Sequence, residues 1–123
     1  MAFQKTLTTV WNGITLATNV TDANTFSRSI PRTFDVALIT KVTFATSTAE
    51  DVTVNCYASN DNSDFTTSPV ETVTFSASDA ASLILIKELR LKVNDLLYLK
   101  FTLDNPDDAN TATVTGKLSE SVI

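Results

Sequence analysis

The sequence predicts an all-β protein: an antiparallel β-sandwich or jelly roll of about eight or nine short strands. Threonine and serine account for 21 and 11 of the 123 residues, and the β-branched Thr side chain suits the half-exposed surface of a sheet. Apolar and polar residues also alternate with a period of two along most of the chain, as in strands with one buried face. Turn-forming clusters separate these segments at intervals of about 8 to 15 residues.

The composition bounds the size and class of the protein. With 43% hydrophobic and 19% charged residues, the chain has the balance of a globular protein with one core. Neither a repeat nor a Pro- or Gly-rich linker divides it. We therefore expect a single β-sandwich domain over residues 1–123.

The first strands are expected near the N-terminus. Residues 3–11 and 13–20 both alternate, and the pattern puts Leu7 and Trp11 on the same face. Asn12-Gly13 lies between the two segments, and this dipeptide is the strongest short signal for a two-residue hairpin turn. The sequence therefore predicts a hairpin near position 12.

The next segments are less regular. Residues 22–29 are polar and rich in turn formers, so they are interpreted as a connection. Ile30-Pro31 then interrupts any ladder, because proline lacks a backbone N–H. Extended patterns resume over residues 32–36 and 40–44.

The clearest strand covers residues 52–57, where Cys56 shares an apolar face with the other even-numbered positions. This strand is expected to lie in the middle of a sheet. Residues 59–69 are rich in Asn, Asp, Ser and Thr and form the main predicted loop. The alternation restarts over residues 70–75.

Two interpretations are open for residues 78–97. Apolar residues such as Leu89 and Val93 recur at near-helical spacing, and Ala80-Ala81 favours a helix start. The same residues also alternate strictly with charged ones, which favours a strand, and we prefer the strand. Asn94-Asp95 is then expected to form a turn.

The last part of the chain repeats the strand pattern. Residues 97–103 alternate, residues 104–108 form a turn cluster, and residues 111–118 form the final strand. The two inner faces are expected to share a core. Its predicted members are Phe44, Val54, Phe75, Leu99, Phe101 and Val114.

The sequence offers no catalytic residues that we can assign. It contains no histidine, which removes the Ser-His-Asp and Cys-His arrangements and histidine metal sites. The single cysteine, Cys56, is interpreted as a small buried hydrophobe. We therefore expect a protein without enzymatic activity and without a cofactor.

The net charge of the chain disfavours two classes of binding partner. A net charge of −5 and a pI near 4.4 oppose binding to nucleic acid or to an anionic membrane. Apolar runs are too short to span a bilayer, and the N-terminus lacks a secretion signal. We expect synthesis in the cytoplasm.

One loop partly matches a calcium-binding template. Asn60, Asn62, Asp64 and Glu71 occupy positions 1, 3, 5 and 12 of that template. Position 6, however, is Phe65 where the template needs glycine. A solvated hairpin loop is the favoured interpretation, and no metal site is assigned.

Three aromatic residues are candidates for partner binding. Trp11, Phe26 and Phe65 fall in or beside predicted loops, where an exposed ring can anchor a partner. The alternative is that each ring plugs one end of the core.

The order of features over residues 33–118 resembles a small β-sandwich structural or decoration protein of tailed phages. The resemblance rests on Thr33-Phe34-Asp35-Val36, on the strand at 52–57 with the loop at 58–65, and on Leu96 to Leu103 before a closing Thr-rich strand. The family's loop usually carries glycines where this chain has Asn and Ser.

The resemblance implies a virion component, made in the host cytoplasm, that binds capsid or other virion proteins and forms a possible homo-oligomer. A second interpretation of the β-pattern and the loop aromatics is a carbohydrate-binding or adhesin-type module.

Overall fold

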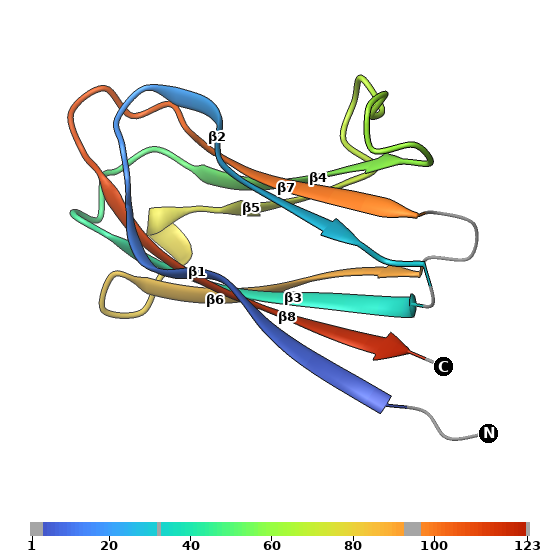
Figure 1. Ribbon diagram of the computed structural model, residues 1–123. Coiled ribbons are helices and arrows are strands. Elements are labelled where there is room, and N and C mark those ends of the chain that lie inside the picture. The colour runs from blue at the N-terminus through green and yellow to red at the C-terminus, as the bar shows by residue number, and fades with distance from the viewer. Residues whose placement is uncertain (1–3, 32, 93–96, 123) are drawn as a thin grey trace.

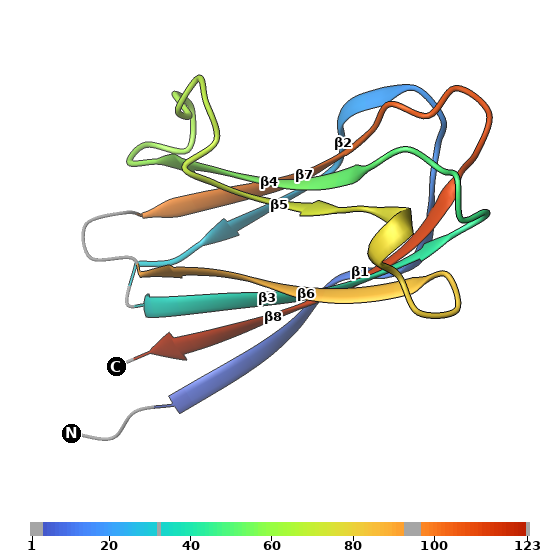
Figure 2. The same cartoon turned by 180° about the vertical axis from the view of Figure 1, so that it is seen from behind.

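The structure is a computed structural model that describes residues 4–31, 33–92 and 97–122. Two four-stranded antiparallel sheets stack face to face (Figures 1 and 2). The all-β sandwich prediction is confirmed, with eight strands in the described part of the chain. None of the described residues belongs to a helix that is long and apolar enough to cross a membrane.

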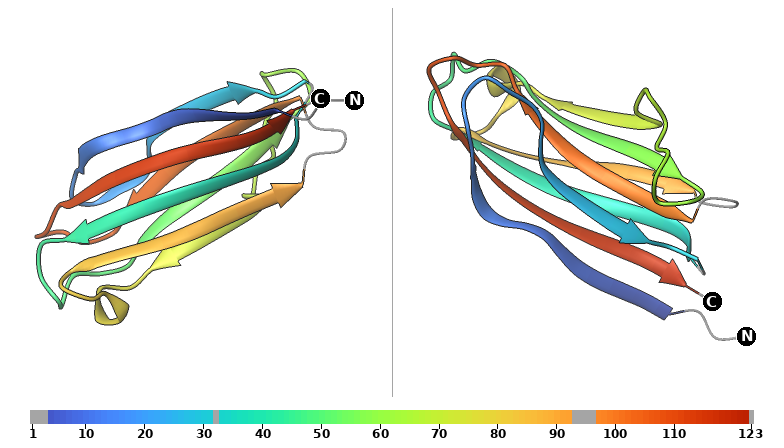
Figure 3. Two further views of the ribbon diagram at one scale, coloured as in Figure 1. Left: turned by 90° about the horizontal axis from the view of Figure 1, so that it is seen from below. Right: turned by 45° about the horizontal axis from the view of Figure 1, so that its top comes forward.

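Sheet A, as we name the first sheet, has the strand order β1-β8-β3-β6 (Figure 3, left). Its strands are β1 (Gln4–Leu16), β8 (Ala112–Val122), β3 (Thr33–Phe44) and β6 (Ile84–Lys92). The two central strands, β3 and β8, pair in register from Asp35 and Ser121 to Phe44 and Ala112. β1 and β6 form the edges.

Sheet B has the order β2-β7-β4-β5. Its strands are β2 (Val20–Ser29), β7 (Tyr98–Asn105), β4 (Val52–Ser59) and β5 (Glu71–Phe75). A 3-10 turn, η1 (Ala77–Asp79), connects β5 of sheet B to β6 of sheet A. The predicted central position of the strand at 52–57 is confirmed, because β4 lies between β7 and β5.

The core fills the space between the two inner faces. All six predicted core residues are at most 3% exposed. The alternation along β4, β7 and β8 therefore predicted the inward side chains correctly. Burial of these aliphatic and aromatic groups supplies the main stabilisation, at about 25 cal/mol per Å² of apolar surface.

The predicted hairpin at Asn12-Gly13 is wrong. β1 continues through this dipeptide and pairs with β8 on both sides of it. Gly13 does have a positive φ of 60°, but it serves a β-bulge, where its N–H donates to Thr115 Oγ1 at 3.0 Å. The register shifts between Thr9 and Trp11, which turns Trp11 inward while Leu7 faces out.

The segment 22–29, interpreted as a connection, is part of strand β2. The register between β2 and β7 shifts between Val20 and Ala23 and again between Ala23 and Phe26. Asp22 and Asn24 have positive φ values of 50° and 52°. These residues therefore form bulges within a strand and do not end it, because short polar side chains tolerate the left-handed region.

The structure also tests the predictions for residues 30–44 and for residues 78–97. The break at Ile30-Pro31 is confirmed, but the segments predicted at 32–36 and 40–44 are joined in one strand, β3. The strand interpretation of 78–97 is confirmed for Ile84–Lys92 by β6, whereas residues 78 and 79 belong to the 3-10 turn η1, and no α-helix forms among the described residues of this segment. The predicted turn at Asn94-Asp95 lies outside the described residues.

Polar side chains also join the two sheets. Arg28 of β2 contacts the buried Glu120 of β8, with 2.6 Å between Nε and Oε1. Near the other edge, Lys87 of β6 donates to the Thr74 carbonyl of β5 at 2.8 Å. Both contacts hold the sheets in a fixed relative position.

Candidate interaction surfaces

Trp11 lies in the core. The residue is 4% exposed, and its Nε1–H donates to the Asn24 carbonyl of β2 at 2.8 Å. The ring packs directly over Gly116, where an added Cβ would lie 2.6 Å from Trp11 Cε3. This placement agrees with the interpretation of Trp11 as a core plug and leaves little of the ring for a partner.

Phe26 and Phe65 lie on separate elements. Phe26, in β2, is opposite Phe101 and packs against the core while remaining half-buried. Phe65 is half-buried in the loop between β4 and β5. Because Trp11 is buried in the core, the three predicted aromatics do not form one exposed platform.

Phe65 instead belongs to a cluster on the outer face of sheet B. Lys100 Nζ lies 4.7 Å from the centroid of the Phe65 ring and 5.0 Å from that of Tyr57. One face of each ring is therefore occupied by the ammonium group, an attractive cation–π arrangement. The sequence pattern did not predict the contact of Lys100 with these two rings.

A polar network fixes the neighbouring part of this face. Asp22 Oδ1 accepts from Tyr57 Oη at 2.8 Å and from Thr102 Oγ1 at 2.7 Å. Burial, together with the bond to Asp22, raises the pKa of Tyr57 to about 12. The Asp22 N–H in turn donates to Asp104 Oδ1 at 2.7 Å. The outer face of sheet B is thus a fixed polar surface.

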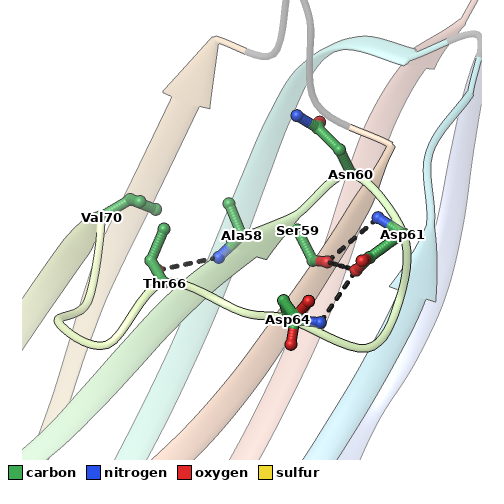
Figure 4. A pocket seen from close by; sticks show the side chains of 7 residues that line it. All are labelled: Ala58, Ser59, Asn60, Asp61, Asp64, Thr66 and Val70. Atoms are coloured by element: carbon green, nitrogen blue, oxygen red, sulfur yellow. Dashed lines mark hydrogen bonds between the residues drawn. The ribbon is translucent and has the colours of Figure 1, made fainter.

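The β4–β5 loop encloses a shallow hollow of about 300 Å³ (Figure 4). Asp61 organises the loop, because its Oδ1 accepts from the N–H groups of Asp64 at 2.8 Å and Ser63 at 2.9 Å. These bonds lower the pKa of Asp61. The hollow is lined by Ala58, Ser59, Asn60, Asp61, Asp64, Thr66 and Val70.

The geometry of the β4–β5 loop can be compared with the calcium-binding template that its sequence partly matches. The Asp61 carboxylate is directed at its own loop backbone and at Ser59 Oγ, 2.9 Å away. Across residues 4–31, 33–92 and 97–122, no three His, Cys, Asp or Glu side chains lie close enough to hold a metal ion. The arrangement is that of a self-supporting loop.

Cys56 is fully buried in β4. Burial is the main reason that the pKa of its thiol rises to about 12, with a smaller effect from Glu71. A thiol of this kind stays protonated at neutral pH and is a poor nucleophile. Cys56 therefore acts as a core residue.

The outer face of sheet A carries an apolar hollow of about 390 Å³. Leu7, Ile39 and Ile86 line it from β1, β3 and β6, with exposures of 69%, 42% and 59%. Lys41 and Lys117 complete the walls together with Thr115 and Ser119. The hollow therefore crosses all four strands of the sheet, and an exposed apolar feature of this kind marks a candidate contact site.

Sequence reasoning missed this hollow. The signal was present as runs of consecutive apolar residues, 36–39 and 83–86, because a strand with apolar residues at successive positions is apolar on both faces. The neighbours in the sheet decide whether such outer side chains meet. Only the observed strand order brings Leu7 to the same face as Ile86.

The face around the hollow is basic. The register directs two acidic side chains outward, Asp35 and Glu88, and Arg90 pairs with both, at 2.9 Å and 3.0 Å. The outward basic side chains are more numerous: Lys5, Lys41, Arg90, Lys92 and Lys117. This face thus has surplus positive charge in a protein whose net charge is −5.

The opposite charge gathers at one end of the sandwich. The loops 17–19, 45–51, 76–83 and 106–111 meet there, at the left of Figure 1 and away from the termini. Together these four loops contain no Lys or Arg. Their acidic residues are Glu50, Asp51, Asp79, Asp107 and Asp108.

Asp107 holds this acidic end together. It accepts from the N–H groups of Ala109 at 2.9 Å, Asn110 at 3.0 Å and Glu50 at 3.1 Å. These bonds, led by the one from Ala109, lower the pKa of Asp107 to about 2. The acidic end is therefore a defined surface, because one carboxylate ties the 45–51 and 106–111 loops together.

Comparison with known proteins adds information at the level of the fold. No protein-family model matches the sequence, and no curated protein matches it. Among solved structures, VP2 of infectious bursal disease virus, determined as a subviral particle, has a TM-score of 0.59 at 12% identity. That match covers 98% of this chain and 32% of VP2, so the chain spans about a third of the length of VP2.

Two other structures are similar. The SPBc2 prophage-derived protein YomS has a TM-score of 0.59 at 12% identity, over 98% of this chain and 96% of YomS. An isomalto-dextranase of Arthrobacter globiformis T6, complexed with panose, has a TM-score of 0.50 at 11% identity, over 95% of this chain and 23% of the enzyme. The same sandwich thus occurs in a viral particle, in a prophage-derived protein and within a larger enzyme.

Proposed function

We propose that the protein is a non-enzymatic structural component of a phage particle that works by surface contact. The observation that carries the proposal is the fold match to YomS, because it extends over nearly the full length of both chains. The likeness to VP2 of a subviral particle supports the same class of function. Because one fold can serve many functions, the outer surfaces of the protein are the second support for this proposal.

The surfaces of the protein suit such a role. The sandwich is held together by its own core and by the Arg28–Glu120 contact between sheets. Its outer faces offer an apolar hollow and segregated charge, and chains presenting such features to a repeated lattice gain avidity from many weak contacts. Cys56 is buried and the sequence has no histidine, so the arrangements in which histidine activates a serine or a cysteine are missing.

More specifically, we propose a decoration or cement protein that binds capsid or other virion proteins. The chain would fold as one domain over residues 1–123 and contact the lattice without the help of a metal or a cofactor. Its localisation would be the virion, after synthesis in the host cytoplasm.

The test is the composition of purified particles. Particles released from cells that carry this gene are purified on a density gradient, and the chain is quantified by mass spectrometry in particles and in the remaining lysate. The proposal predicts many copies per particle, in a constant ratio to the major capsid protein. Abundant chain in the lysate with none in the particles would contradict it.

A second candidate is a carbohydrate-binding module. The isomalto-dextranase complexed with panose shares the fold, and Tyr57 and Phe65 place two rings on one side of the molecule. Against this, Lys100 occupies one face of each ring, and sugars stack on such faces. A glycan array decides between the candidates: saturable binding that Tyr57→Ala abolishes favours this module, and an array without hits removes it.

A further inference from the structure

We propose that copies of this chain associate head to tail, with the acidic four-loop end of one copy docked on the basic apolar face of sheet A of the next. This inference goes beyond the virion role and does not depend on it, because both surfaces belong to the same chain. It concerns the hollow lined by Leu7, Ile39 and Ile86 and the loops 17–19, 45–51, 76–83 and 106–111.

The sheet A face has the features of a contact surface. Three large aliphatic side chains meet in one hollow and are between 42% and 69% exposed. Exposed apolar groups that gather in one place, with a polar rim, are typical of protein–protein contact sites. Lys41 and Lys117 stand at this rim without any ion pair among the described residues, so their charges are available to a partner.

The positive charge of the sheet A face indicates the kind of protein surface that can bind it. The partner surface must be acidic, because Lys41 and Lys117 are not neutralised by any described residue of the chain. The four-loop end meets this requirement, since it carries Asp51, Asp79 and Asp108 as exposed acids and has no basic residue. It also exposes small residues in the 106–111 loop that can approach an apolar surface closely.

The same charges argue against the symmetric alternative. In a two-fold dimer each surface meets its own copy, so the surplus positive charge of one sheet A face would meet that of the other, and two acidic ends would repel in the same way. Head-to-tail contact brings unlike charges together. Because the two surfaces lie on different parts of one molecule, each copy can bind two neighbours, and the contact can repeat.

Charge reversal tests this arrangement in solution. The face variant is Lys41→Glu/Lys117→Glu, and the end variant is Asp51→Lys/Asp108→Lys. All four side chains are exposed, so their replacement should leave the fold intact, and thermal unfolding checks that each variant folds. Sedimentation velocity over a concentration series measures self-association of the full chain at low salt.

The expected result has three parts. The wild type forms species larger than a dimer as concentration rises, and it dissociates as salt shortens the range of the attraction to about 8 Å or less. Each variant alone associates at least about tenfold more weakly, because the face variant loses the surplus positive charge of its face and the end variant loses most of the negative charge of its end. An equal mixture of the two variants recovers association, because the unchanged acidic end of the face variant meets the unchanged basic face of the end variant. In addition, the two new lysines of the end variant can meet the two new glutamates of the face variant.

A matched control separates the contact from net charge. Asp64→Lys/Glu71→Lys changes net charge by the same amount as the end variant, but on the β4–β5 side of the molecule, and it should associate like the wild type. A wild-type chain that remains monomeric overturns the proposal, and the partner of the sheet A face is then a different acidic protein. Association that stops at a dimer, or a mixture that does not recover it, also overturns it.

Discussion

At the scale of single residues, Gly116 determines how Trp11 packs. A Cβ at position 116 would lie 2.6 Å from Cε3 and 3.2 Å from Cζ3 of the indole. The ring cannot easily retreat, because its Nε1–H is bonded to the Asn24 carbonyl at 2.8 Å. The glycine is therefore required by a close approach between β8 and β1.

This contact predicts the effect of Gly116→Ala. The added methyl group should lower the free energy of unfolding by about 1 to 3 kcal/mol, as overpacking does in well-filled cores. Chemical denaturation measures the loss. As a control, Gly13→Asn should cost less, because nothing lies within 4 Å of its Cβ position and Asn tolerates its φ of 60°. Equal stability of Gly116→Ala and wild type would contradict the packing.

Asp107 predicts a component of the pH dependence of stability. Its pKa is about 2 in the folded protein, against an ordinary value of 3.8. A carboxylate with a lowered pKa stabilises the fold above its unfolded pKa, and that contribution disappears as pH falls from about 4 towards 2. Asp107→Asn should melt at lower temperature than wild type at pH 7, with the gap narrowing below pH 4. A constant gap down to pH 2 would be inconsistent with this role.

At the scale of elements, the alternation of apolar and polar residues predicts the buried face of a strand correctly where the strand has no β-bulge. The inward side chains of β4, β7 and β8 were predicted because each strand pairs in continuous register with a neighbour. The prediction failed where bulges shift the register, as in β1 near Gly13 and in β2 near Asp22. A bulge uses the same Asn, Asp and Gly residues as a turn, so local sequence cannot separate the two.

The candidate surfaces were predictable only in part. Phe65 was expected in a loop, but its contact with Lys100 depends on how the β4–β5 loop lies over β7. The sheet A hollow needs residues from β1, β3 and β6, which come together through a strand order that no local pattern encodes. Contacts between distant segments are decided by topology.

The contact between Arg28 and Glu120 joins β2 to β8 across the two sheets. Glu120 is 3% exposed, and its Oε2 also accepts from Thr33 Oγ1 at 3.2 Å. Glu120→Gln should lower the free energy of unfolding by about 2 kcal/mol, because it removes the charge that compensates Arg28. Denaturant titration measures this. The double variant Arg28→Met/Glu120→Met should lose less than Glu120→Gln, and a larger loss would contradict the explanation.

At the scale of the whole molecule, the most informative feature is the separation of charge. The chain has a net charge of −5. Nevertheless, one sheet face has surplus positive charge, and at one end of the molecule all the charged residues are acidic. Together with the hollow on sheet A, this arrangement gives the molecule two different contact surfaces. A stiff sandwich with such surfaces is suited to a repeated assembly, in which each copy meets its neighbours in the same way.

The central claim is that this protein contacts its neighbours through the outer face of sheet A. Lysine footprinting tests this claim most directly. Amine-reactive labelling, read out by mass spectrometry, compares the isolated chain at low concentration with the chain in purified particles. We predict that Lys41 and Lys117 lose most of their reactivity in the particles, while Lys100 on sheet B serves as an internal reference. Equal reactivity of Lys41 and Lys117 in both states would contradict the account.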